Sequence, residues 1–258
     1  MPMKYPDPYR SMGHGFTLIE IAIVLFIVTL LMGGLLPTLS GQIEQRRNSD
    51  TGKQLNEIKD ALIGYAVMNG RLPCPAAPNT SGVESPVGGG ACTNFYNGFV
   101  PAATLGLAGT DSAGYVVDSW GNRIRYAVTS WNSSSPAFSD VFTTANGMST
   151  VGITSLAPTS LAVCSSSAGI SSSSCGSGAW LTSSTNGVPA VIFSTGKNGA
   201  QGSTGIGSDE MANLDANPTF VSHLPTAKGA ANGYFDDIVI WISPNVLINR
   251  MVAAGKLP

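Results

Sequence analysis

The chain has 258 residues, of which 43% are hydrophobic, and this is enough to bury a core in one or two domains. Charged residues make up only 11%, less than half of the roughly 25% usual in soluble globular domains. Thirteen Lys and Arg against fifteen Asp and Glu give a net charge of -2. The composition therefore excludes a disordered chain and disfavours a nucleic-acid-binding protein of the histone or repressor type.

A polar leader of fifteen residues opens the chain, and a long apolar run follows it. The apolar length of about 24 residues, at positions 16–39, is enough for a helix to cross a hydrocarbon core of roughly 30 Å. A secretory signal peptide is cut after its apolar segment, but the small-residue cut site here, Gly15-Phe16, lies before it. Cleavage at this bond would keep the predicted transmembrane helix on the mature chain and create a free amine at Phe16.

Glu20 is an acidic residue inside this apolar run. A carboxylate at this depth costs about 2.5–3.5 kcal/mol on insertion scales, and no Lys or Arg occurs in the 23 residues after it. We expect the α-amino group of Phe16 to neutralise Glu20, either within one chain or between neighbouring subunits. The alternative is a carboxylate that reaches the membrane interface. Pro37, preceded by a Gly33-Gly34 pair, is expected to make the helix pliable.

Residues 15–20 read Gly-Phe-Thr-Leu-Ile-Glu, and this motif before an apolar helix resembles the class III signal of type IV prepilins and type II secretion pseudopilins. The resemblance implies that a prepilin peptidase cuts after Gly15 and methylates Phe16, and that Glu20 and Pro37 serve assembly. The implied partners are this peptidase, other pilin or pseudopilin subunits and the inner-membrane assembly platform. The implied fold is α+β and type IV pilin-like: a long N-terminal helix, transmembrane and then amphipathic, packed on a C-terminal antiparallel β-sheet domain.

The amphipathic half of the helix is predicted over residues 40–70. Leu55, Ile58, Leu62, Tyr65 and Ala66 recur at steps of three and four residues, with charged residues between them. One helix could thus run from about residue 16 to residue 69, where a glycine and two prolines follow. Residues 71–258 would form the globular domain.

Four cysteines lie in loops rich in Gly, Ser and Pro, as the close pairs Cys74/Cys92 and Cys164/Cys175. Neither spacing fits a zinc site, which usually has two to four residues between paired ligands. Two disulfides in an oxidising compartment are the better interpretation. Of the three possible connectivities, pairing of neighbours is the simplest. The presence of disulfides places the domain outside the cytoplasm.

The globular part reads as short strands between turns, with the clearest candidates at residues 123–129, 190–193 and 237–242. Residues 165–177 are nearly all Ser and Gly and are expected to form a surface loop closed by a disulfide. A closing helix is expected over residues 244–254, capped by Ser243 and ended by Gly255. Its buried side is expected to hold Val246, Leu247, Met251 and Val252.

Further segments of this domain resemble pseudopilins. They are Asp118-Ser119-Trp120-Gly121-Asn122 with Tyr126, and the loop of residues 193–199 with Asp236-Asp237-Ile238, which resembles the closing loop and last strand of that family. Arg71 to Ala76 resembles a signature seen in a branch of pilin-like proteins. Major pseudopilins bind Ca²⁺ in the closing loop, and carboxylates that could contribute here are Asp209, Glu210, Asp215, Asp236 and Asp237. However, Lys197-Asn198 stands where the family has an acid. We therefore expect no metal or other cofactor, with Ca²⁺ as the alternative.

Signals of an enzyme or a nucleic-acid-binding protein are weak. Ser194 to Lys197 fits the S-x-x-K pattern without its companion motifs, and His223 has no matched nucleophile. Arg123, Arg125, Tyr126 and Trp131 form only a small basic and aromatic set. The expected function is that of a structural filament subunit. Its length, its large loops and the missing acid in the closing loop favour a minor subunit over a major one. It would be anchored in the inner membrane with a periplasmic domain and assembled into a type IV pilus or a type II secretion pseudopilus. The alternative is a membrane-tethered periplasmic binding protein or adhesin that does not polymerise.

Overall fold

The computed structural model describes residues 15–157, 160–171, 174–185, 187–199 and 207–257. Of the predicted leader, residues 1–14 lie outside the described residues, and so does the side chain of Pro37. The chain divides into two units, residues 1–46 and residues 47–258.

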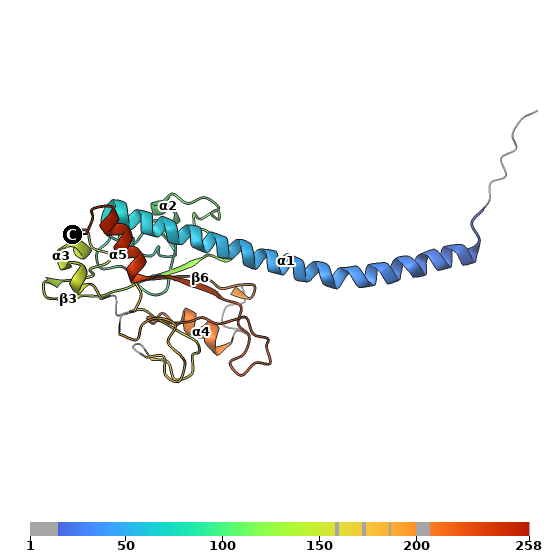
Figure 1. The fold of residues 1–258 in the computed structure, drawn as a ribbon. Helices are drawn as coiled ribbons and strands as arrows, with labels where there is room; N and C mark the ends of the chain where they lie inside the picture. Colours follow the sequence, from blue (N-terminus) through green and yellow to red (C-terminus); the bar gives the residue numbers. More distant parts are fainter. Residues whose placement is uncertain (1–14, 158–159, 172–173, 186, 200–206, 258) are drawn as a thin grey trace, which may run out of the picture. The chain divides into compact units, whose positions relative to one another are not determined.

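Helix α1 runs over Leu18–Asn69, 52 residues in all (Figure 1). It begins two residues after the predicted start and ends at the predicted residue. It continues through Pro37, so the proline does not end the helix. Gly70 follows with a φ of 68°, the left-handed conformation that commonly ends a helix at a glycine. Among the described residues, no helix combines the length and the apolar character needed to cross a membrane.

The second unit contains residues 47–69 of α1, and the predicted buried face of this part is confirmed. Leu55, Leu62 and Ala66 are fully buried, and Ile58 is 1% exposed. Tyr65 is half-buried. A helix that places apolar side chains at every third or fourth position presents one continuous stripe to a core.

The central sheet has four antiparallel strands in the order β1-β2-β6-β8. Their bounds are Gly98–Phe99, Arg125–Val128, Ala190–Ser194 and Ile238–Ile242. The three strands predicted from the sequence are therefore confirmed as β2, β6 and β8, and they are neighbours. The short strand β1, which pairs Phe99 with Arg125 at the edge of the sheet, was not predicted.

Both faces of the sheet are covered, because successive residues of a strand point to opposite sides. Tyr126, Val128 and Ile192 share one core with the buried face of α1. Ala127 and Val191 belong to a second core on the other side. Burial on both faces explains why every residue of β6 is buried and why its sequence is a continuous apolar run rather than an alternating one.

The second core is completed by a parallel pair of strands, β5 (Ala162–Cys164) and β7 (Thr219–Val221), which the sequence analysis did not predict. Val163 and Phe220 from this pair pack in that core. The remaining short elements are α2 (Ala102–Leu105), β3 (Ser133–Ser134), β4 (Ala137–Phe138), α3 (Gly147–Val151), a 3₁₀ turn (Ile153–Ser155) and α4 (Ser208–Leu214).

Helix α5 (Pro244–Ala253) confirms the closing helix, with two corrections. Leu247 and Met251 are buried as predicted, but Val246 is 45% exposed and Val252 is 42% exposed. The fully buried face of this short helix therefore consists of Leu247 and Met251, which are four residues apart, and Val246 and Val252 beside them face outward. Ser243 precedes the helix, but its side chain makes no capping hydrogen bond.

Two disulfides join neighbouring cysteines, Cys74 to Cys92 and Cys164 to Cys175. This is the pairing expected from the sequence. The first bridge closes a loop between residues 18 positions apart, and the second closes the Ser- and Gly-rich loop between residues 11 positions apart. Both loops lie outside the central sheet, and each bridge restrains the connection that it closes.

Candidate functional site

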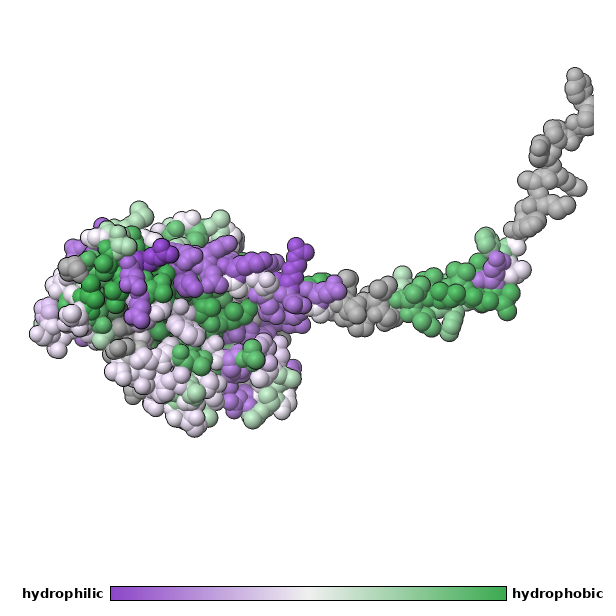
Figure 2. Space-filling model, viewed as in Figure 1, coloured by the Kyte–Doolittle hydropathy of each residue, from purple (hydrophilic) through white to green (hydrophobic). Residues whose placement is uncertain are grey.

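The N-terminal part of α1 exposes its apolar side chains in the first unit. Phe16 is 77% exposed and Leu18 is 90% exposed, and large apolar side chains stay exposed as far as Met32 at 62%. In Figure 2 this stretch is almost uniformly hydrophobic, whereas the part of α1 beyond the grey residues is hydrophilic. Monomeric soluble proteins rarely expose an apolar surface of this extent, so the stretch marks a surface that is buried against something else.

Glu20 takes part in a reciprocal cap at the start of α1. The Thr17 N–H donates to Glu20 Oε2 at 3.4 Å, and the Glu20 N–H donates to Thr17 Oγ1 at 3.3 Å. This is the capping box of the S/T-x-x-E pattern, which satisfies two N–H groups that a helix start otherwise leaves without partners. The sequence analysis missed this role, although Thr17 three residues before Glu20 was the available signal.

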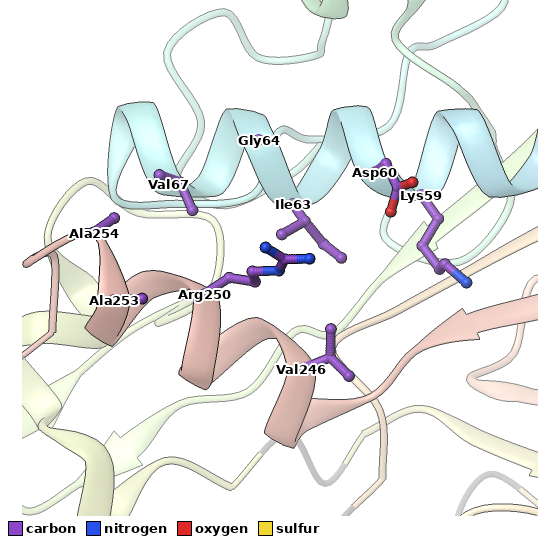
Figure 3. A pocket seen from close by; sticks show the side chains of 9 residues that line it. All are labelled: Lys59, Asp60, Ile63, Gly64, Val67, Val246, Arg250, Ala253 and Ala254. Carbon is purple, nitrogen blue, oxygen red and sulfur yellow. The ribbon is translucent and has the colours of Figure 1, made fainter.

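A shallow groove of about 630 Å³ lies between α1 and α5 in the second unit (Figure 3). Arg250 extends from α5 across the groove toward α1, and its guanidinium lies beside Ile63. Lys59 and Asp60 of α1 line the same groove. An apolar floor with charged groups at the rim is typical of a protein contact surface rather than of an enclosed small-molecule pocket.

The segment that begins at Arg71 is held by a buried ion pair. Arg71 donates from Nη1 and Nη2 to the two carboxylate oxygens of Glu84, at 2.8 and 2.7 Å, and both side chains are at least 93% buried. Burial acts to raise the pKa of Glu84, but the hydrogen bonds from Arg71 and from the Cys74 N–H outweigh it and lower that pKa. This pair and the Cys74–Cys92 bridge fix the same loop, so the segment has a structural role.

Residues 118–122 brace the loop that follows strand β6. Asp118 Oδ1 accepts the N–H groups of Trp120 and Asn122, and the Ser194 hydroxyl donates to Asp118 Oδ2 at 2.5 Å. Asn122 donates from its amide to the Gly196 carbonyl at 2.6 Å. Ser194 is fully buried and its hydroxyl is engaged with Asp118, so the S-x-x-K pattern does not form an activated nucleophile.

Three of the five carboxylates considered for calcium come together. Carboxylate oxygens of Glu210, Asp236 and Asp237 lie within 4.8 Å of one another. Burial raises the pKa of Asp237 well above its usual range, and the charges of Glu210 and Asp236 add to this effect. Asp209 and Asp215 do not join them, since the first accepts from His223 and the second accepts from an adjacent loop N–H.

Amide groups compensate most of this acidic cluster. Asn198 donates to Glu210 Oε2 at 2.8 Å, and Asn213 donates to Asp237 Oδ2 at 2.7 Å. Asp236 Oδ1 is the buried side-chain oxygen without a hydrogen-bond partner among the described residues. Three carboxylates suit a hard cation such as Ca²⁺, but two of them already accept from amides. Glu210, Asp236 and Asp237 could therefore hold an ion, but the hydrogen bonds to Glu210 and Asp237 already stabilise these carboxylates without one.

His223 is paired with a carboxylate, not poised for catalysis. Its Nε2 lies 3.0 Å from Asp209 Oδ2 and its Nδ1 lies 2.7 Å from the Leu224 carbonyl oxygen. The ring stacks on Phe235 at a centroid distance of 3.9 Å. Since both ring nitrogens are engaged, neither faces a serine as a general base would. The pairing was not predicted, because Asp209 lies in α4 whereas His223 lies 14 residues later in the loop after β7.

The basic and aromatic set does not form a stripe for nucleic acid. Tyr126 is fully buried, and its hydroxyl donates to the Pro73 carbonyl at 3.1 Å. Trp131 packs edge-on against Phe142 in the core on the helix side of the sheet. Tyr126 therefore presents no face on which a base could stack, and the half-buried Trp131 does not by itself make a series of stacking rings.

Comparison with known proteins identifies the N-terminal segment. Residues 10–36 match the family model described as the prokaryotic N-terminal methylation motif. No curated protein and no solved structure matches the chain. The match covers Gly15, Phe16 and Glu20, and it covers most of the exposed apolar stretch of α1.

Proposed function

Because residues 10–36 carry the class III signal of type IV pilins and pseudopilins, we propose that the chain is a pilin-like structural subunit. Prepilin peptidase cuts it after Gly15 and methylates Phe16, and the subunit then assembles through its N-terminal helix into a type IV pilus or a type II secretion pseudopilus. It has no catalytic activity and needs no cofactor. The methylation motif directly before an exposed apolar helix is the observation that carries this proposal.

The exposed apolar stretch supports both anchoring and assembly. Burying a Val, Leu, Ile or Phe side chain stabilises a structure by about 1.5–3 kcal/mol relative to leaving it in water. The side chains exposed between Phe16 and Met32 therefore need either lipid or other apolar helices around them. Residues 16–39 serve as the inner-membrane anchor of the precursor, and the same surface is buried against neighbouring subunits after extraction to the assembly platform.

The disulfides support a periplasmic location for the globular domain. All four cysteines are paired, and structural disulfides persist in oxidising compartments. A helix anchored at its N-terminal half with this domain on the far side of the membrane is the topology that an exported filament subunit requires.

Mass spectrometry of the protein from its native membrane tests the processing. We expect a chain that starts at Phe16, carries one added methyl group and has four hydrogen atoms fewer than the reduced chain, because of its two disulfides. Gly15→Val should leave the leader attached. A native chain that keeps residues 1–15, or that is cut after the apolar run, would contradict the proposal.

Glu20 distinguishes a filament subunit from a tethered periplasmic binding protein or adhesin. A simple anchor has no use for a carboxylate in its apolar segment, whereas assembly pairs it with the amine of Phe16. We expect Glu20→Val to leave membrane insertion intact and to abolish sheared filaments that contain the protein. Glu57→Gln, which removes an exposed carboxylate farther along α1, is the matched control and should assemble normally. A wild type that forms no sheared filaments, together with a Glu20→Val variant that behaves as the wild type does, would favour the tethered protein.

A further inference from the structure

Arg125 lies in a hollow of about 310 Å³ beside the edge of the sheet. Strand β2 places it opposite Phe99 of β1 and Phe193 of β6. The hollow is also lined by Asn122, Thr195 and Leu214. The guanidinium is therefore held by a sheet rather than by a loose surface loop, and its position is fixed before any ligand arrives.

The guanidinium has donors to spare. Its Nη1 donates to Asn97 Oδ1 at 2.6 Å, and its central carbon lies 4.6 Å from the centroid of the Phe99 ring. Among the described residues, no carboxylate forms an ion pair with it. Burial lowers the pKa of Arg125, with no acid acting in the opposite direction. A guanidinium carries five N–H groups, and within the described part of the chain Asn97 is the one hydrogen-bond acceptor of this side chain, so four N–H groups have no partner there.

The neighbouring charges do not neutralise Arg125. Arg123 donates from Nε to Asp111 Oδ2 at 2.7 Å, so these two charges cancel each other. Asp118 is turned toward Ser194, and Asp215 accepts from the N–H and the amide of Asn217. Residues 200–206 lie outside the described residues and their sequence contains no acid. The hollow thus keeps one uncompensated positive charge.

We propose that this hollow binds a carboxylate group, supplied by a small organic acid or by an acidic side chain of a polypeptide. A partly buried arginine with a planar face on an aromatic ring and free N–H groups in one plane matches a carboxylate in a two-pronged geometry. Asn97 and Phe99 hold that plane in place. One cation is too few for a nucleic-acid backbone, whose binding depends on several phosphate contacts. The proposal does not depend on filament assembly.

Titration with succinate tests the site. The full-length mature chain in detergent micelles, labelled with ¹⁵N-arginine, is titrated with sodium succinate at constant ionic strength, and the Nε–H resonances are followed. We expect a saturable shift of the Arg125 resonance, with a Kd on the order of 1 mM, which is the strength of a pair of charge-assisted hydrogen bonds at a partly solvated site. Shifts that are equal for all arginines and do not saturate would overturn the proposal.

Two variants separate charge from geometry. Arg125→Lys keeps the charge but lacks the planar fork, and it should weaken succinate binding at least roughly tenfold. Arg250→Gln removes an exposed arginine of α5, outside the hollow, and should bind as the wild type does. If Arg125→Lys does not fold, the saturation at Arg125 in the wild type and in Arg250→Gln still decides. Unchanged affinity in a folded Arg125→Lys variant would overturn the proposal.

Further probes identify the chemistry. Inorganic phosphate should bind more weakly than succinate, because a tetrahedral anion matches the planar fork less well, and tighter phosphate binding would overturn the carboxylate assignment. The peptide acetyl-Gly-Asp-Gly-amide distinguishes the two sources. Tighter binding of the peptide than of succinate supports an acidic side chain of a partner, and weaker binding supports a small organic acid.

Discussion

Glu84→Gln should strongly destabilise the globular unit. Glu84 is 4% exposed and accepts hydrogen bonds from both Nη atoms of Arg71 and from the N–H groups of Cys74 and Gly88. Removal of its charge leaves the Arg71 guanidinium buried without a counter-ion. It also turns an amide NH₂ toward groups that are themselves donors, so at least one buried donor loses its partner.

The size of the effect follows from these contacts. Hydrogen bonds to charged groups contribute about 1.5–3 kcal/mol each, and Glu84→Gln disturbs the two from Arg71. This estimate agrees with the roughly 3–5 kcal/mol measured when one partner of a buried ion pair is removed. In a unit of this size, 1 kcal/mol shifts the Tm by about 2–4 °C. We therefore expect the free energy of unfolding to fall by about 3–5 kcal/mol and the Tm to fall by roughly 6–20 °C.

Guanidinium chloride unfolding, followed by circular dichroism, measures the free energy of unfolding. Glu57→Gln removes an exposed acid from the same chain and should stay within about 0.5 kcal/mol of the wild type. The double variant Arg71→Gln/Glu84→Gln should lose less than the sum of the two single variants, because the second change removes the charge that the first leaves unpaired. A loss below about 1 kcal/mol for Glu84→Gln would refute the reasoning.

Further predictions concern the core and the acidic cluster. Leu62→Ala should cost about 2–5 kcal/mol in chemical unfolding, because Leu62 is fully buried against the sheet, whereas Met68→Ala, at an exposed position, should cost less than about 0.5 kcal/mol. Burial raises the folded-state pKa of Asp237, so the wild type loses stability as the pH rises from the unfolded-state pKa through the folded-state pKa. Asp237→Asn removes this loss. Its Tm should therefore exceed that of the wild type above about pH 4 but not below it. EDTA should leave the Tm unchanged, and a rise of several degrees with CaCl₂ that Asp237→Asn abolishes would instead identify the cluster as a cation site.

Elements with a strong local period were predictable from the sequence. The stripe from Leu55 to Ala66 repeats over three turns, and the apolar runs of β6 and β8 are bounded by turn residues. The cysteine pairs are close in sequence, so neighbour pairing needed no knowledge of the fold. In each case the information lies within one short window of the chain.

Elements that depend on distant contacts were not predictable. Strands β5 and β7 have three residues each, and their register joins Ala162 to Thr219 across 57 positions.

The ion pair of Arg71 and Glu84, in contrast, left a signal in the sequence, because Glu84 is the only charged residue between Arg71 and Asp111. Two isolated opposite charges in an uncharged stretch are expected to find each other when both are buried. The pair of Asp209 and His223 left no comparable signal.

The capping box lies on the C-terminal side of the proposed cleavage site. Cleavage after Gly15 would remove neither Thr17 nor Glu20, the two residues that form the box. The box holds a Glu20 carboxylate oxygen 3.4 Å from the Thr17 nitrogen, one residue from the amine that the proposed cleavage would create at Phe16. Negative charge at a helix start is favoured by the helix dipole and by the free N–H groups there. One carboxylate in this position therefore stabilises the start of the helix and, under the proposed processing, would stand beside a positive charge that a neighbouring subunit could share. Its replacement by Val removes this charge pair and makes the segment more apolar, so under that proposal it should affect assembly more than insertion.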